Sequence, residues 1–467
     1  MNKKEMYVLR EDIFILLCSD GFIRVYKKNR NDRFAIESLY IISKIQAIIL
    51  LFFKNGNTID KASIELSQLY SIDFDKSKKI VNEIVERYSM LLDISKTLKE
   101  RDGLPKELIK ILTASEVKRP REVKFDFVRP KIPESIVVFI SDVCKCDCIY
   151  CRVDSGFSQK NAHFIEMDVI DKIVYECDKY GIKDIELTGG DPVMHPRFTD
   201  ILRRFYKLNL FVKFSTKCPI NVNKLNMLKE IGVEQLQFSL DSIEENAYIR
   251  LTRTSEDYYH NIMQTIQCAV NLGFIVKIKS VITRINIEQL EKLIIFFYNI
   301  GIFKFSFQQL SCGDRAFSEQ FMPEKEQFVE FDRKLYEIEL MYPKLEIERS
   351  YNLEYILSDE RQRKYFRPDC MAGRNGIVVQ IDGSYSYCGQ SFNKNLRFLN
   401  IKETCLLDAW NSRELAEMLL PERIVFRGTK CYSCNDFDIC LRKRCYVRVL
   451  NASGKLYDVD PFCPYVE

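Results

Sequence analysis

Residues 142–151, with the sequence DVCKCDCIYC, carry four cysteines within ten positions: Cys144, Cys146, Cys148 and Cys151. Cysteines that are two positions apart are poorly placed to form an unstrained disulfide. The chain contains 17 cysteines, an odd number, but only three histidines. A ligand set that is rich in thiolates and poor in imidazoles favours zinc or an iron–sulfur cluster. The segment is therefore predicted to bind a metal centre of one of these two kinds.

The overall composition limits the kinds of partner. The chain has 467 residues, of which 46% are hydrophobic, and this length suggests about three globular domains. Lysine and arginine total 70 and aspartate and glutamate total 66, so the net charge of +4 argues against a dedicated nucleic-acid-binding protein. The longest apolar run, residues 45–53, is too short to span a bilayer and is expected to form a buried helix. No secretory signal is recognised, so we expect a cytoplasmic protein that contacts neither nucleic acid nor membrane.

The first part of the chain is expected to form a small separate domain. In residues 1–95, an Asp-Gly turn between two apolar stretches indicates a hairpin. Helical periodicity follows at residues 37–53, 59–70 and 76–90. A hairpin with three helices predicts a winged-helix-like domain. The charged, proline-broken residues 96–130 are interpreted as a linker.

Residues 131–345 alternate short apolar strands with amphipathic helices. The expected strands lie at residues 135–141, 182–189, 210–216, 233–240, 274–283 and 302–310. This alternation predicts an α/β fold with a parallel sheet, and six repeats suggest a partial (β/α)6 TIM-like barrel. In such folds the chemistry lies at the carboxyl ends of the strands. Residues 346–467 lose this alternation and gain cysteines, which predicts a C-terminal cluster-binding domain.

The cysteine-rich segment follows the first of these strands. Cys144, Cys148 and Cys151 have the spacing C-x3-C-x2-C. Three thiolates can hold three irons of a 4Fe–4S cluster and leave the fourth iron open, whereas a structural zinc site takes four ligands. This spacing, the aromatic Tyr150 and the position after strand one resemble the radical S-adenosylmethionine (radical SAM) superfamily. Cys146 lies outside the spacing and is expected not to be a ligand.

The resemblance also implies residues that bind S-adenosylmethionine. The sequence TGGDP after the second strand is similar to the G-G-E-P motif of the family, with aspartate in place of glutamate. Its glycines are expected to let backbone groups reach the amino group of the cofactor. In similar enzymes, polar residues after the third and fourth strands and an arginine further on contact the ribose and the carboxylate. The residues predicted to bind the cofactor are Tyr150, Gly189, Gly190, Asp191, Ser215, Lys217, Ser239, Asp241 and Arg253. Each residue alone would also suit a strand-end cap, but together they follow the strand ends in register.

The tail carries a second group of cysteines that resembles the seven-cysteine SPASM extension, which binds auxiliary iron–sulfur clusters. A zinc ribbon built from C-x2-C pairs is the alternative, but it leaves the outlying cysteines unexplained. The resemblance implies that Cys431, Cys434, Cys440 and Cys463 share one cluster. The other three cysteines would then leave one iron of a second cluster without a cysteine ligand. These three are Cys370, Cys388 and Cys445, the last of which is one position further from Cys440 than is usual.

These resemblances together imply a radical SAM maturase of ribosomally made peptides, similar to the subtilosin-type enzymes that form thioethers. The implied cofactors are three 4Fe–4S clusters and S-adenosylmethionine. The implied partners are a precursor peptide, whose leader would add a strand to the N-terminal domain, and a flavodoxin- or ferredoxin-type electron donor. No individual catalytic residue is predicted, although Cys312 after the sixth strand is a hypothetical hydrogen donor. The alternatives are a carbon–carbon crosslinking or epimerising maturase, a formylglycine-type sulfatase maturase, and an iron–sulfur DNA-binding regulator.

Overall fold

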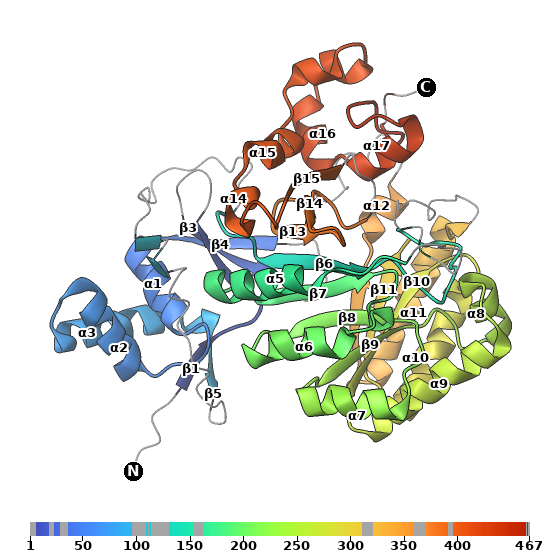
Figure 1. Ribbon diagram of the computed structural model, residues 1–467, viewed down its shortest axis with the longest axis horizontal. Coiled ribbons are helices and arrows are strands. Elements are labelled where there is room, and N and C mark those ends of the chain that lie inside the picture. Colours follow the sequence, from blue (N-terminus) through green and yellow to red (C-terminus); the bar gives the residue numbers. More distant parts are fainter. Residues whose placement is uncertain are drawn as a thin grey trace. The chain divides into compact units, whose positions relative to one another are not determined.

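The structure is a computed structural model. It describes residues 6–17, 23–28, 36–95, 109–110, 112–113, 130–153, 155, 162–310, 321–358, 370, 372–390, 396–463 and 465. The chain divides into two compact units, Met1–Pro133 with Tyr175–Ile182, and Glu134–Val174 with Lys183–Glu467 (Figure 1). Cys312 and most of the predicted linker lie outside the described residues. None of the helices described has both the length and the apolar character needed to cross a membrane.

The first unit combines small antiparallel sheets with three helices (Figure 1). One described sheet has the order β2-β3-β4, and a second pairs β1 with β5. The strands are β1 (Met6–Leu9), β2 (Ile13–Leu17), β3 (Ile23–Lys28), β4 (Ile36–Ile42) and β5 (Leu92–Ser95). The helices are α1 (Lys44–Phe52), α2 (Ile59–Tyr70), α3 (Phe74–Arg87) and the 3-10 turn η1 (Ser89–Leu91).

The helix predicted at residues 37–53 is wrong in its first half. Residues 36–42 form β4 and pair with β3, so that Ile42 lies opposite Ile23. The helix begins only after Ser43, whose hydroxyl accepts a hydrogen bond from the backbone of Gln46 while the Gln46 side chain accepts one from the backbone of Ser43. This capping box fixes the helix start, and the β-branched residues before it favour a strand.

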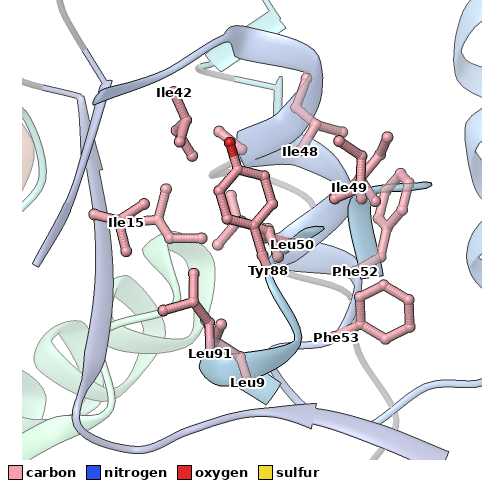
Figure 2. Close-up of a cluster of buried hydrophobic side chains, with 14 of the residues drawn as sticks. Leu9, Ile15, Ile42, Ile48, Ile49, Leu50, Phe52, Phe53, Tyr88 and Leu91 are labelled. Atoms are coloured by element: carbon pink, nitrogen blue, oxygen red, sulfur yellow. The ribbon is translucent and has the colours of Figure 1, made fainter. Parts of the chain in front are cut away.

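Helix α1 lies at the centre of the hydrophobic core of this unit, as its apolar sequence predicts. All its residues from Ala47 to Phe52 are buried. Figure 2 shows side chains of α1 packed against residues of the first strands and of the segment after α3. The labelled members are Leu9, Ile15, Ile42, Ile48, Ile49, Leu50, Phe52, Phe53, Tyr88 and Leu91.

The second unit is built on a parallel sheet, which confirms the predicted α/β fold. Its described strands have the order β12-β11-β10-β9-β8-β7-β6-β13-β14-β15. The parallel strands of the barrel part are β6 (Ser135–Ser141), β7 (Asp184–Gly189), β8 (Val212–Thr216), β9 (Gln235–Ser239), β10 (Ile275–Ile282), β11 (Lys304–Gln309) and β12 (Glu346–Ser350). Six of them match the predicted strands, and β12 is an additional edge strand that the sequence analysis missed.

Helices connect these strands (Figure 1). They are α5 (Met167–Tyr180), α6 (Phe198–Lys207), α7 (Val222–Ile231), α8 (Glu245–Thr252), α9 (Glu256–Asn271), α10 (Leu290–Asn299), α11 (Lys325–Met341) and α12 (Leu353–Leu357). Two 3-10 turns, η2 (Pro192–Met194) and η3 (Ile287–Gln289), follow β7 and β10.

The C-terminal region continues the barrel sheet. Strand β13 (Gly376–Val379) pairs in parallel with β6, and β14 (Ser384–Ser386) and β15 (Arg397–Asn400) extend it in antiparallel fashion. A Cβ atom at Gly376 would lie 2.2 Å from the Ser135 hydroxyl, so this close pairing requires glycine. The remaining elements are α14 (Leu406–Trp410), α15 (Arg413–Leu419), η6 (Arg423–Phe426), η7 (Lys430–Ser433), α16 (Phe437–Lys443) and α17 (Tyr446–Ser453).

Candidate iron–sulfur and cofactor sites

The cysteine loop 142–151 follows the carboxyl end of β6 and is anchored to the end of α8. The backbone N–H of Asp147 donates to the carbonyl of Thr252 at 2.9 Å, and that of Ile149 donates to Leu251 at 3.0 Å. Cys148 is buried, whereas Cys144 and Cys151 are half-buried. The structure thus places the three predicted ligands on one anchored loop, and the donor set of three thiols fits an iron–sulfur cluster.

Cys146 occupies a different environment from its three neighbours. It is 1% exposed, and its thiol lies 3.6 Å from the hydroxyl of Tyr258. Hydrogen bonds with Cys144 and Cys148, together with burial, raise its pKa far above the ordinary value of a thiol. The same contact lowers the pKa of Cys148. Cys146 is therefore engaged as a protonated thiol that donates to its neighbours.

The TGGDP segment packs its backbone against the start of the cysteine loop. Gly190 N–H donates to the carbonyl of Ser141 at 2.7 Å, and Asp191 N–H donates to that of Val143 at 2.8 Å. A Cβ atom at Gly190 would lie 2.3 Å from the Val143 oxygen, so glycine is required there. Gly189 is equally confined, since its Cβ would meet Ser141. These glycines therefore serve the contact between two loops of the site.

The side chain of Asp191 is committed to holding the next loop. It is buried, and it accepts hydrogen bonds from the Thr216 hydroxyl at 2.9 Å and from the backbone N–H groups of Lys217 at 2.8 Å and Val193 at 3.1 Å. Burial raises its pKa, and these donors oppose the rise. Asp191 therefore joins the loops after β7 and β8, and the shorter side chain that replaces the family's glutamate has this role in the structure.

Three of the predicted cofactor residues meet in a buried ionic cluster. The Lys217 ammonium lies 2.6 Å from the Asp241 carboxylate, whose side chain is 0% exposed. The Tyr150 hydroxyl donates to the same carboxylate, and Lys217 lies 5.5 Å from the centre of the Tyr150 ring. Burial by itself lowers the pKa of Lys217, but the attraction of Asp241 outweighs it and the net direction is upward. The cluster therefore stays ionised beside the cysteine loop.

Asn286 supports this ionic cluster and was missed by the sequence analysis. Its side-chain amide donates to the carbonyls of Asp241 at 2.7 Å and Val281 at 2.9 Å, and it is fully buried. Val281 N–H in turn donates to the Asp241 carboxylate at 2.8 Å. No local pattern in the sequence marks an asparagine after the fifth strand as part of a site formed by the third and fourth.

Two further predicted positions are brought together, and one lies apart from them. The hydroxyls of Ser215 and Ser239 lie 2.6 Å from each other at the ends of β8 and β9. Arg253 follows α8 in the left-handed conformation, with a φ of 53°, and its guanidinium donates to Asp147 at 3.0 Å. The structure thus pairs Arg253 with the cysteine loop itself.

The C-terminal cysteines form two neighbourhoods. Burial and then the nearby Cys370 raise the pKa of Cys388 to about 12. The rings of Tyr387 and Tyr446, which adjoin Cys388 and Cys445 in the chain, pack edge to face with centroids 5.5 Å apart. Cys370, Cys388 and Cys445 are therefore brought to one region of the domain.

The other four cysteines form the second neighbourhood, which we call the outer set: Cys431, Cys434, Cys440 and Cys463. Burial raises the pKa of Cys463, and the nearby Cys431 and Cys434 thiols add to the rise. Burial likewise raises the pKa of Cys440 to about 12, with Asp460, Cys431 and Cys463 contributing. Four thiols within mutual electrostatic range fit the donor set of a 4Fe–4S cluster.

Buried charges hold the cysteines of the tail in place. Arg448 donates two hydrogen bonds to Asp460, at 2.7 Å and 2.6 Å, and both residues are buried. Asp460 also accepts from the backbone of Cys445 at 3.5 Å, and its carbonyl accepts from that of Cys463 at 2.8 Å. The pair therefore links one cysteine of each neighbourhood.

Two other arginines lie near thiols that the sequence analysis assigned to clusters. Arg444 is 2% exposed, and its guanidinium lies 3.9 Å from the sulfur of Cys431. Arg152 follows Cys151 and donates to Thr188 at 3.1 Å, and its charge lowers the pKa of Cys388. These positive charges suit sites that gather several thiolates.

Comparisons with known proteins agree with this arrangement. Residues 138–297 match the Radical SAM superfamily, and residues 370–441 match SPASM, an iron–sulfur cluster-binding domain. A probable GTP 3',8-cyclase of Saccharolobus solfataricus is 23% identical over 265 residues, which are 55% of this chain and 82% of that protein. The corresponding protein of Sulfurisphaera tokodaii is 25% identical over 282 residues, 57% of this chain and 85% of its own.

Among solved structures, SuiB of Streptococcus suis bound to the precursor peptide SuiA is similar over 98% of this chain and 99% of its own, with a TM-score of 0.67 and 16% identity. SuiB bound to S-adenosylmethionine gives the same TM-score with 17% identity. These matches confirm the predicted fold, with its partial barrel and its SPASM domain, and the expectation of iron–sulfur clusters and S-adenosylmethionine.

Proposed function

We propose that this chain, a radical SAM enzyme with a C-terminal SPASM domain, matures a ribosomally made precursor peptide by installing a crosslink. The observation that carries the proposal is the similarity to SuiB over 98% of the chain, which includes the N-terminal unit. The probable cyclases, by contrast, align with only 55% and 57% of it. SuiB was solved with its precursor peptide, and by analogy a peptide is the substrate class that best fits this chain.

The N-terminal unit would bind the leader of the precursor. β2 and β4 are the outer strands of the described three-stranded sheet, so an extended peptide can add to an edge by main-chain hydrogen bonds. Exposed apolar side chains in the same unit, at Phe74, Met90 and Ile94, would contact apolar leader residues. The sheet and the apolar side chains support a peptide-binding role for residues 1–95.

The barrel would carry the hydrogen abstraction. A 4Fe–4S cluster with S-adenosylmethionine supplies this chemistry when bound. Cys144, Cys148 and Cys151 would hold three of its irons. The buried Lys217–Asp241 pair would fix the strand ends on which the cofactor lies, and the paired hydroxyls of β8 and β9 would contact it.

The SPASM domain would hold two auxiliary clusters, giving three clusters in all. The outer set supplies four thiols to one of them. Cys370, Cys388 and Cys445 supply three to the other, so that one iron is open to a thiolate of the substrate. Such an arrangement favours a thioether as the crosslink, because the cysteine of the peptide would be held as a thiolate near the carbon radical.

Co-expression with a precursor peptide encoded beside the gene tests the proposal. Mass spectrometry of the peptide should find the loss of a pair of hydrogen atoms, and fragmentation should locate the crosslink. The matched control is the enzyme with Cys144, Cys148 and Cys151 replaced by alanine, which should leave the peptide unmodified. An unmodified peptide together with conversion of GTP by the purified enzyme would refute the proposal.

A further inference from the structure

The segment that precedes the outer set exposes several apolar side chains. Each of five residues is between 40% and 49% exposed: Leu420, Ile424, Val425, Tyr432 and Tyr465. Turns η6 and η7, which carry three of them, pack against each other. We call these five residues and the basic residues beside them the η6–η7 face. Apolar residues that gather on a surface in this way mark an interaction site more often than isolated ones do.

This face is the outer wall of the outer cysteine set. Cys431 lies within η7 and Cys434 caps its end. The Arg423 guanidinium donates to the carbonyl of Cys434 at 3.1 Å, and the Lys430 ammonium donates to that of Tyr465 at 3.4 Å. A partner seated on the face would therefore be separated from the cluster site by one layer of protein.

The charges on the rim of the face are mainly positive. Arg423, Arg427 and Lys430 are exposed within η6, η7 and the turn between them, and Glu422 is the exposed acidic residue of that stretch. Complementary charge steers association, so the rim selects for a partner with an acidic contact surface.

We propose that the η6–η7 face is the docking surface for a small acidic one-electron carrier of the flavodoxin or ferredoxin class, which exchanges electrons with the outer cluster. This inference rests on the proposed function. When the substrate radical forms the new bond, it releases a proton and one electron, and the electron enters the auxiliary clusters. The oxidised carrier takes up that electron and leaves reduced by one electron, so the outer site is ready for the next turnover.

The same features argue against two other occupants. A second copy of this chain would bring one basic rim against another across a symmetric contact, which is repulsive. A nucleic acid would need a continuous basic surface, whereas the centre of this face is apolar. A carrier with an apolar patch inside an acidic rim matches both the centre and the edge.

The test is the affinity of the intact, cluster-loaded enzyme for a purified oxidised flavodoxin and a purified 2Fe–2S ferredoxin, measured calorimetrically at low and high salt. The face variant is Ile424→Glu/Arg427→Glu. Its matched control is Val222→Glu/Lys207→Glu, which makes the same chemical changes at exposed positions of the barrel. The face variant should bind about tenfold more weakly or worse, the control should bind within about twofold of the parent, and added salt should weaken the parent complex.

Iron content and S-adenosylmethionine cleavage with a chemical reductant should be unchanged in both variants, which excludes misfolding as the cause. Equal affinity of the parent and the face variant would refute the inference, as would failure of both carriers to bind the parent. Loss of carrier binding in the face variant while no precursor peptide is ever modified would uphold the docking surface and reject the proposed function.

Discussion

Replacing Arg448 by methionine tests whether the buried Arg448–Asp460 pair holds the tail cysteines in place. The side chains are 9% and 2% exposed, and the two hydrogen bonds between them are bidentate. Methionine keeps most of the volume of the side chain, so the change removes mainly the positive charge and leaves the Asp460 carboxylate buried without its cation.

The expected cost follows from this burial. Removing one partner of a buried ion pair costs about 3–5 kcal/mol, because the other charge is left uncompensated. Asp460 keeps hydrogen bonds from Phe462 N–H at 3.0 Å and Cys445 N–H at 3.5 Å, so we expect a loss near the lower end, about 3 kcal/mol. The double variant Arg448→Met/Asp460→Leu should lose less than the sum of the two single changes, since it leaves no buried charge.

The assay is denaturant unfolding of the cluster-loaded protein, followed by the loss of cluster absorbance, with the iron content per chain as a second readout. Arg413→Met is the control, because the Arg413–Glu417 pair is exposed and lies within the same domain, and it should unfold like the parent. If Arg448→Met lowers the free energy of unfolding by less than about 1 kcal/mol, the pair contributes no more than a surface ion pair and the reasoning fails.

Three further predictions concern other parts of the structure. Replacing Cys144, Cys148 and Cys151 together by alanine should abolish anaerobic formation of deoxyadenosine while the iron of the tail remains, whereas Cys146→Ala should retain the first cluster; persistent cleavage in the triple variant would overturn the assignment of the loop. Arg444→Gln removes a buried charge 3.9 Å from Cys431, so a redox titration should find the midpoint potential of one auxiliary cluster shifted to more negative values, and identical potentials would contradict this. Burial lowers the pKa of His195, so below about pH 6.5 the unfolded chain binds the proton more readily and stability falls as the pH decreases; His195→Gln should flatten this dependence in thermal unfolding, and an unchanged slope would count against it.

The barrel and the cysteine loop were predictable because their signals are local. The alternation of apolar residues in strands such as β6 and the spacing of three cysteines depend on neighbouring positions only. Strand β12 was missed because its sequence, EIERS, is mostly polar. It pairs at the edge of the sheet through β11, with Lys304 3.1 Å from Glu346, and a polar edge strand has no periodic apolar signal.

The residues that support the sites were not predictable for the opposite reason, since their partners are distant in the chain. Asp460 is recognisable as a support only when its contact with Arg448 is known, and Asn286 only through Asp241, which lies 45 positions earlier. A single asparagine or aspartate in a loop has many structural uses, so no spacing rule identifies these two.

The pairing of β13 with β6 explains how the two cluster regions can share one framework. Gly376–Val379 runs in parallel beside Ser135–Val138, and the loop with the first cysteines leaves the carboxyl end of that same strand. The half-buried Cys151 packs against a hydrophobic cluster that contains Phe139 of β6 and Val378 of β13. A change in the position of the C-terminal hairpin would therefore move the third cysteine of the first loop. If the substrate radical must lose an electron to an auxiliary cluster, such shared packing keeps donor and acceptor at a fixed separation, which two domains joined only by a flexible linker would not do.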